Sequence, residues 1–143
     1  MIPKDEYLLR LSKLREFMAR KNIGLTVIAN KSNMIYFAGT DQAILMLIPL
    51  DGNPLLVARY AFGDELCKEE SWIQNIEVLR PYFGLSIKES NKAEVKDFLK
   101  RFARSMQLEG SIGVDDTDLI NMIHKCFKGR GEHDLLNVLM SIF

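Results

Sequence analysis

Two apolar, β-prone runs around a tight polar turn place the strongest constraint on how this 143-residue chain can fold. Residues 43–50 and 55–60 flank the tetrapeptide Asp51-Gly52-Asn53-Pro54. An Asp-Gly step between two such runs is typical of a β-hairpin, because glycine reaches the positive φ angles that tight turns require. Pro49 lacks a backbone N–H donor, so we expect it at the end of its strand. The sequence therefore predicts an antiparallel hairpin over about 43–60.

Amphipathic helical patterns alternate with short buried strands along the rest of the chain. One long helix is predicted over 4–21, with its end at Asn22, and another over 92–106, after a capping box of Asn91 and Glu94. The buried face of the first helix is predicted to hold Leu8, Leu11, Leu14 and Met18. Shorter elements are predicted as strands at 25–29, 76–79 and 112–114 and helices at 62–70, 117–128 and 135–140. This order predicts an α/β fold, a mixed β-sheet that contains the hairpin and is flanked by helices on both faces.

The length and composition of the chain indicate one compact domain without a strongly charged surface. A typical domain has about 100–200 residues, and 48% hydrophobic residues provide enough apolar surface for a buried core. Nineteen Lys and Arg residues balance nineteen Asp and Glu residues, which argues against binding nucleic acid through a basic face. On the 92–106 helix, Lys100 and Arg101 alternate with Glu94 and Asp97, as on an ordinary solvent-exposed face.

The cysteine count and the distribution of apolar residues indicate a cytoplasmic protein. Two cysteines, Cys67 and Cys126, are too few for a disulfide scaffold and fit a reducing compartment. Residues 1–6 become charged at once and contain no apolar signal core. The longest apolar run, 43–50, is far shorter than the roughly 20 residues that a membrane span needs. We therefore expect no membrane partner and no nucleic-acid partner.

Histidines and cysteines are too scattered to predict a metal site or a nucleophile. His124 and Cys126 lie two positions apart on a predicted helix and so point to different faces, and His133 lies in a predicted polar loop. Cys67 lies close to several glutamates, whose charges are expected to raise the pKa of its thiol and deactivate it. From the residues alone, we predict neither a metal ligand set nor a catalytic residue in this chain.

Asp115 and Asp116 form an acidic pair at the end of a predicted strand, where α/β proteins collect functional groups. A metal-dependent phosphoryl-transfer site would need further acids and a lysine at other strand ends, and none can be assigned. A cap for the following helix needs only the pair itself, so capping is the interpretation that we favour. The isolated glycines Gly24, Gly39 and Gly52 do not form a phosphate-binding loop.

The sequence ends on Ser141-Ile142-Phe143, within an apolar helical pattern and without a stop signal. Natural C-termini are usually polar and frayed. We therefore expect the chain to continue in a longer parent protein.

Taken in order, the elements resemble the N-terminal domain of the creatinase/prolidase family. Residues 10–18 followed by 22–28 are similar to the helix, turn and first strand that open this domain. The segment Asn33-Met34-Ile35-Tyr36-Phe37-Ala38-Gly39-Thr40 is similar to the family pattern Asn-x-x-Tyr-Leu-Thr-Gly-Phe, and the hairpin follows directly. Gly113-Val114-Asp115 resembles the last strand, and residues 134–139 resemble the lead-in to the next domain.

The resemblance implies that residues 1–143 are a single N-terminal domain of an enzyme that cleaves Xaa-Pro bonds or related amides. In that family, two Asp, one His and two Glu of a separate C-terminal domain hold two divalent metal ions. Those ligands are not expected in this chain, so it should bind no catalytic metal and should be inactive alone. Its implied role is dimerisation and shaping of the active-site entrance. The implied partners are a second copy of the chain and its own catalytic domain.

The resemblance points to a loop with Asn33, Tyr36, Gly39 and Thr40 as the part nearest the substrate. In this interpretation Gly39 permits a tight turn, and Tyr36 offers an aromatic wall with a hydroxyl group. The alternative is that Tyr36 and Phe37 fill the core below the first strand while Gly39 serves only the turn. The alternative is slightly favoured, because aromatic side chains at such positions usually pack.

Two other functions stay open at the level of sequence. The chain could be a catalytically silent protein-interaction module of the same fold, or a free-standing small α/β binding domain. The metal ligands downstream of Phe143 separate the peptidase from the silent module. A true terminus at Phe143 would favour the free-standing domain.

Overall fold

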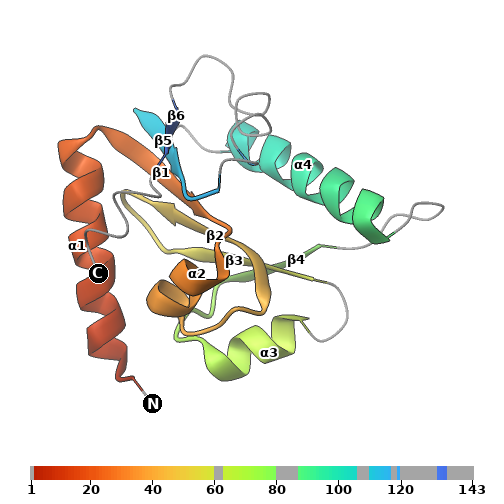
Figure 1. Cartoon of the computed structure of the whole chain (residues 1–143), viewed down its shortest axis with the longest axis horizontal. Coiled ribbons are helices and arrows are strands. Elements are labelled where there is room, and N and C mark those ends of the chain that lie inside the picture. Colours follow the sequence, from red (N-terminus) through yellow and green to blue (C-terminus); the bar gives the residue numbers. More distant parts are fainter. Residues whose placement is uncertain are drawn as a thin grey trace.

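The computed structural model describes residues 2–59, 63–79, 87–105, 110–116, 119 and 132–134. Their helices and strands are, in chain order, α1 (Lys4–Arg20), β1 (Ile23–Ile28), α2 (Lys31–Ala38), β2 (Ala43–Pro49), β3 (Leu55–Arg59), α3 (Gly63–Glu70), β4 (Ile76–Leu79), α4 (Ile87–Ser105), β5 (Ser111–Val114) and β6 (Glu132–Asp134). The strands of these segments form one six-stranded sheet in the order β4-β3-β2-β1-β5-β6. Figure 1 shows this sheet between α4 on one side and α1, α2 and α3 on the other.

The sheet is mixed, as the sequence predicts. Strand β2 pairs antiparallel with both β1 and β3, so the predicted hairpin is confirmed. Strands β3 and β4, β1 and β5, and β5 and β6 pair in parallel. Pro49 ends β2 as expected, and Gly52 in the following turn has a φ of 104°. The predicted fold class, α/β with helices on both faces, is therefore confirmed.

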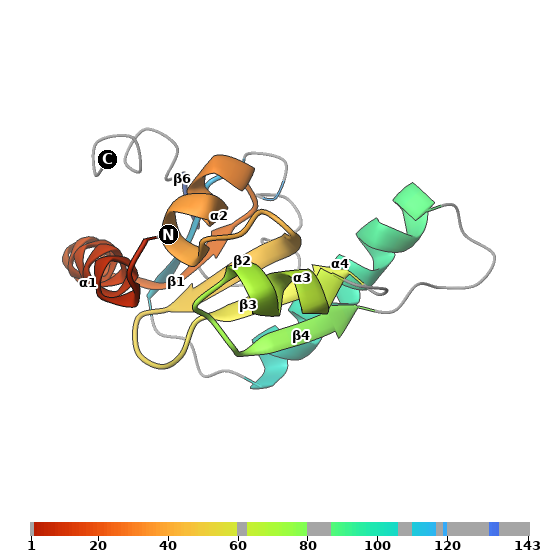
Figure 2. The same ribbon diagram turned by 90° about the horizontal axis from the view of Figure 1, so that it is seen from below.

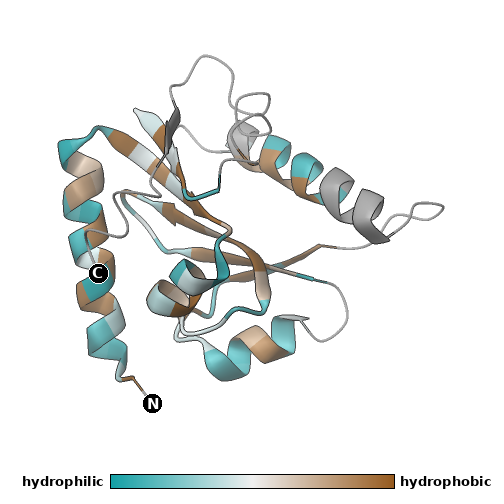
Figure 3. Ribbon diagram, viewed as in Figure 1, coloured by the Kyte–Doolittle hydropathy of each residue, from teal (hydrophilic) through white to brown (hydrophobic). Residues whose placement is uncertain are grey.

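Two apolar clusters hold the helices against the two faces of the sheet. The α1–α3 cluster includes Leu14, Met18, Phe37, Met46, Ile48 and Cys67. The α4 cluster includes Leu25, Val27, Leu47, Val57, Leu99 and Val114. Neighbouring residues of β2 belong to opposite clusters because strand side chains alternate between faces. Figure 3 shows hydrophobic residues concentrated along the strands, and Figure 2 shows the helices and the sheet from below.

Helix α1 has the predicted bounds but a slightly rotated buried face. Leu11, Leu14 and Met18 are buried, whereas Leu8 is 41% exposed and Tyr7 takes its place at 9%. Positions 7, 11, 14 and 18 also follow helical spacing, and the choice between 7 and 8 depends on a distant contact. The ring of Tyr7 stacks on Trp72, which lies between α3 and β4. Asn22 has a φ of 56° and provides the predicted left-handed exit.

The other long helix differs from its prediction at its beginning and on its exposed face. Helix α4 begins at Ile87, so Asn91 lies inside it and the predicted capping box is wrong. Glu94 is 5% exposed, not on the wet side, because it adjoins Val95 and Phe98 on the arc that faces the sheet. None of the helices in the described segments is long and apolar enough to cross a membrane.

Near the end of the chain the structure corrects one prediction and leaves others untested. His133 belongs to β6, which pairs with β5, and is not in a loop. Three residues do not reveal a strand by periodicity, because their pairing depends on a distant partner. The predicted helices at 117–128 and 135–140, with His124 and Cys126, lie outside the described residues.

Candidate functional site

The segment that the sequence analysis treats as a loop is a helix, α2. Asn30 caps its N-terminus, since the Asn30 Oδ1 atom accepts a hydrogen bond of 3.2 Å from the backbone N–H of Asn33. Gly39 caps its C-terminus in the left-handed conformation, with a φ of 82°. Both signals are visible in the sequence, an Asn and a Gly that flank eight residues, so the helix could have been predicted.

The C-terminal end of α2 is closed entirely by hydrogen-bond donors. A helix leaves its last four carbonyl groups without partners of its own, and here each of them has one. The pairs are the Gly39 N–H with Ile35 O at 2.9 Å, Arg10 Nη1 with Tyr36 O at 2.8 Å, Trp72 Nε1 with Phe37 O at 2.8 Å and Ser71 Oγ with Ala38 O at 2.5 Å. Three of the four donors come from side chains outside α2. The end of this short helix is therefore fixed to α1 and to the segment between α3 and β4.

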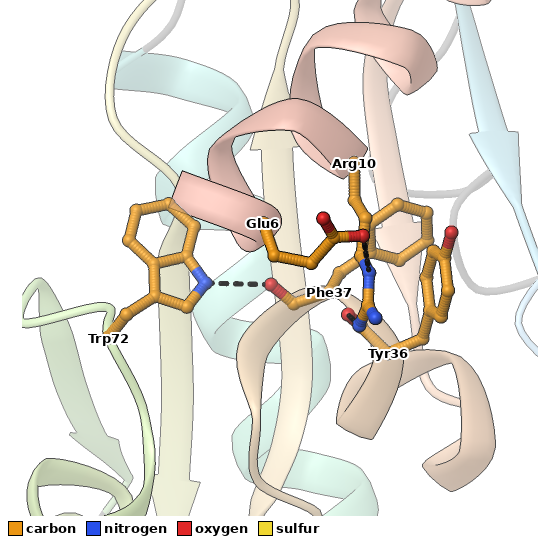
Figure 4. Close-up of polar contacts among 5 residues, drawn as sticks. All are labelled: Glu6, Arg10, Tyr36, Phe37 and Trp72. Carbon is orange, nitrogen blue, oxygen red and sulfur yellow. Dashed lines mark hydrogen bonds and ion pairs between the residues drawn. The ribbon is translucent and has the colours of Figure 1, made fainter. Parts of the chain in front are cut away.

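Arg10 of α1 binds Tyr36 in two ways (Figure 4). Besides its bond to the Tyr36 carbonyl, its guanidinium carbon lies 4.1 Å from the centre of the Tyr36 ring and 5.4 Å from that of Tyr7. Cation–π contacts at such distances contribute about 0.5–2 kcal/mol. Glu6 pairs with Arg10 at 3.4 Å, one turn away on α1. Arg10 thus orients both the backbone and the ring of Tyr36.

Gly39 is required by its conformation and by the space around it. A Cβ atom at this position would lie 2.8 Å from the hydroxyl oxygen of Tyr7 and 3.3 Å from the carbonyl oxygen of Glu70. The positive φ adds backbone strain for any other residue. Gly39 therefore allows α1, α2 and α3 to meet closely at this point.

The N-terminal end of α2 is held by Asp115, which follows β5. Its Oδ1 atom accepts from the backbone N–H of Ala29 at 2.7 Å, and its Oδ2 atom accepts from the N–H of Asn30 at 3.1 Å and from Nδ2 of Asn33 at 3.0 Å. Asp115 is 1% exposed. Burial raises the pKa of its carboxyl group, these three hydrogen bonds oppose that shift, and Asp116 adds to it.

This geometry changes the interpretation of the Asp115–Asp116 pair. The Asp115 carboxylate serves the start of α2, which precedes it in the chain, and not a helix that follows it. Both of its oxygens face N–H donors, an arrangement that does not suit a metal ion. Across the described segments, no three His, Cys, Asp or Glu side chains are grouped so that they could hold a metal. Asp115 thus has a structural task at the carboxyl ends of β1 and β5.

All four predicted site residues have structural contacts, and those of Tyr36 with Arg10 are described above. Asn33 binds Asp115, Gly39 forms the C-cap, and Thr40 is 1% exposed with its Oγ1 3.3 Å from Oε2 of Glu70. Phe37 is 1% exposed and belongs to the core, as the alternative expects for this residue. Tyr36 is half-buried and packs against the α1–α3 cluster.

The sequence analysis missed the residues that support α2. Arg10, Ser71 and Trp72 contact carbonyl groups that lie 26, 33 and 35 residues away along the chain, and Asp115 lies 82 residues from Asn33. No local pattern marks such pairs, because each depends on the sheet bringing distant segments together. Asp115 was noticed as part of the acidic pair and of the family-like Gly113-Val114-Asp115 segment, but its contact with α2 was not predicted.

Cys67 of α3 is fully buried in the α1–α3 cluster. Burial raises the pKa of its thiol, and the charges of Glu70 and Asp64 raise it further, while Lys31 opposes them. The predicted direction is confirmed, although burial contributes more than the acids. A buried thiol with a raised pKa is a poor nucleophile.

The chain matches known proteins along most of its length. The model of the creatinase/prolidase N-terminal domain matches residues 10–134. An Xaa-Pro aminopeptidase from Streptococcus pyogenes has a TM-score of 0.72 at 14% identity, covering 99% of this chain and 100% of that one. The N-terminal domain of an Xaa-Pro dipeptidase from Lactobacillus brevis has a TM-score of 0.65 at 15% identity, covering 92% and 98%. No curated protein sequence matches the chain.

A longer relative shows how much of such a protein this domain represents. The prolidase from Pyrococcus horikoshii has a TM-score of 0.63 at 20% identity, covering 94% of this chain and 34% of that one. The chain thus spans about one third of the length of that prolidase. At these identities the solved structures establish the fold, and the match over residues 10–134 establishes the family. The chain belongs to the creatinase/prolidase N-terminal domain family.

Proposed function

We propose that this chain is the non-catalytic N-terminal domain of a two-metal Xaa-Pro dipeptidase or aminopeptidase. The observation that carries the proposal is the family match over residues 10–134. The similar folds of proteins described as Xaa-Pro dipeptidases and aminopeptidases support it. Metal-assisted hydrolysis would then belong to a catalytic domain outside this chain, and the present residues would bind no catalytic metal.

Within such an enzyme, we propose that α2, its cap Gly39 and the following Thr40 shape the active-site entrance. Donors close all four C-terminal carbonyl groups of α2, and Asp115 holds its first turn. A wall that contacts substrate works best when it is held rigidly before binding. Tyr36 is the residue of this segment that presents an aromatic ring and a hydroxyl group at a half-buried position. Asn33, Gly39 and Thr40 would hold α2, and with it Tyr36, in place through their contacts with the rest of the domain.

We further propose that the domain contributes to a cytoplasmic homodimer and packs against its own catalytic domain. Leu8 and Leu9 of α1 and Ile35 of α2 are 41%, 49% and 49% exposed, and such side chains suit contact with another protein surface. The formal net charge of zero supports protein partners over nucleic acid.

The experiment that tests the proposal begins with the gene beyond the codon for Phe143. The whole product should be expressed and assayed for hydrolysis of Xaa-Pro dipeptides and longer Xaa-Pro peptides, with and without a chelator. We expect metal-dependent hydrolysis by the whole product and none by residues 1–143 alone. A long product without the Asp, Asp, His, Glu and Glu ligands would indicate the silent interaction module. A stop codon after Phe143 would contradict both and leave a free-standing domain.

A further inference from the structure

Asp115 joins two parts of the fold that are distant in the sequence. It follows β5, which lies beside β1 in the sheet, and two residues, Ala29 and Asn30, separate the end of β1 from the start of α2. Its three hydrogen bonds reach Ala29 and Asn30, which connect β1 to α2, and Asn33 in the first turn. A single side chain therefore spans the end of β5, the end of β1 and the beginning of α2.

The chemistry around this carboxylate makes the contact sensitive to substitution. Within the described segments, the groups that face it from the β1–α2 side are two backbone N–H groups and the Asn33 amide, all uncharged. Asp116 is a like charge beside it. The three hydrogen bonds thus compensate for the free-energy cost of burying the charge. If the carboxylate is removed, the buried N–H groups lose their acceptor, which lowers the stability of the fold.

The two ends of α2 differ in how many side chains support them. Arg10, Ser71 and Trp72 support the C-terminal end separately, so the loss of one leaves two. At the N-terminal end, Asn30 caps the helix internally, and Lys31 Nζ donates to Ala43 O of β2 at 2.5 Å. Asp115 is the side chain from outside α2 that binds both the connection and Asn33, through three hydrogen bonds. Substitution of a single supporting residue should therefore loosen the first turn of α2 more than its C-terminal end.

We propose that Asp115 is the positioning residue of the entrance segment, setting the place of the first turn of α2 against β5 and thereby the place of Tyr36. The part of this inference that concerns Tyr36 and substrate rests on the proposed function. The part that concerns α2 and β5 belongs to the domain itself, and the two can be tested separately.

Hydrogen exchange of the 143-residue chain tests the contact between Asp115 and α2. Asp115→Asn keeps the shape but offers a single acceptor oxygen, so one N–H group of the connection loses its partner. We expect the amides of Asn33 and Met34 to exchange about tenfold faster, while the amide of Leu99 in α4 is unchanged. Asp116→Asn removes the neighbouring charge but leaves the three bonds of Asp115 in place. It therefore serves as the matched control, and the exchange rates of the α2 amides should stay nearly unchanged.

A second variant keeps the test decisive if Asp115→Asn does not fold. Asn33→Ala removes one of the three bonds and leaves the carboxylate on the two backbone groups, and we expect about threefold faster exchange in α2. The double variant should exchange more slowly than the product of the two single effects predicts, because both residues belong to one hydrogen-bond cluster. Equal acceleration in α2 and α4, or no acceleration in α2, would overturn the inference.

Kinetics of the whole gene product test the link to substrate. If Tyr36 lines the entrance, Asp115→Asn should raise KM for an Xaa-Pro substrate several-fold and leave kcat within about twofold. A fall in kcat at constant KM would contradict that link. Failure of the proposed function would instead appear as no hydrolysis by the unsubstituted protein, with the exchange result in α2 unaffected.

Discussion

Helices on the two faces of the sheet are held in different ways. Helix α4 lies against one face through the apolar side chains of Val95, Phe98 and Leu99. Helix α2, on the other face, also buries apolar side chains, but hydrogen bonds from other elements hold both its ends. Apolar packing tolerates small shifts, whereas hydrogen bonds fix distance and direction. The comparison indicates that apolar packing mainly stabilises α4, whereas directed hydrogen bonds also fix the position of α2 on the sheet.

The largest effect is expected on the α4 face. Leu99→Ala removes a fully buried side chain and should lower the free energy of unfolding by about 3 kcal/mol. Chemical denaturation monitored by circular dichroism measures this loss. Leu9→Ala, at a position that is 49% exposed, is the control and should change stability by less than about 0.5 kcal/mol. Equal losses for the two variants would mean that α4 is not part of the core.

The next effect concerns the close approach at Gly39. Gly39→Ala combines a φ of 82° with a Cβ atom 2.8 Å from the Tyr7 hydroxyl oxygen, and should cost about 2–3 kcal/mol. Gly52→Ala is a matched control, because it has a φ of 104° but its nearest atom is 3.8 Å away, and should cost about 1 kcal/mol. Thermal unfolding of both variants gives the comparison. A Gly39→Ala variant as stable as Gly52→Ala would show that the helices meet less closely.

A smaller effect is expected when one support of α2 is removed. Arg10→Met keeps much of the apolar stem but loses the bond to Tyr36 O and the contact with its ring, and should cost about 1–2 kcal/mol. Lys13→Met, on the exposed part of α1, is the control. Urea denaturation followed by the fluorescence of the single tryptophan measures both. A loss no larger than that of Lys13→Met would indicate that the contact with Tyr36 contributes no stability.

The smallest effect should be a gain. The Oγ1 atom of Thr26 in β1 is fully buried and has no hydrogen-bond partner among the residues that the structure describes. Thr26→Val replaces this hydroxyl with a methyl group of similar size and should stabilise the domain by about 1 kcal/mol. A raised midpoint of thermal unfolding is the expected result. A lowered midpoint would mean that the hydroxyl has a partner, such as a buried water molecule.

Elements with strong local signals could be predicted from the sequence, and contacts between distant segments could not. The Asp-Gly turn marks the hairpin, and helical spacing marks α1 and most of α4. The capping signals of α2 were present at Asn30 and Gly39, but the segment was interpreted as a loop on the basis of the family resemblance. The exposure of Leu8 and the burial of Glu94 depend on how each helix is rotated against its neighbours.

The candidate site shows the same limit. Asn33, Tyr36, Gly39 and Thr40 lie together in the structure, as their closeness in sequence implies. The residues that hold α2, Arg10, Ser71, Trp72 and Asp115, come from three other places in the chain, and the tertiary fold brings them to α2. The residues of the site could therefore be named from the sequence, but what each one does could not.

The indole proton of Trp72 gives the most direct test of the claim that side chains from other elements fix α2. The chain contains one tryptophan, so its Nε1–H signal in a nuclear magnetic resonance spectrum needs no assignment among several. Because this group donates to Phe37 O at 2.8 Å, its exchange with solvent should be at least about tenfold slower than that of a free indole. Exchange at the rate of a free indole would show that this support of α2 does not form in solution and would contradict the account.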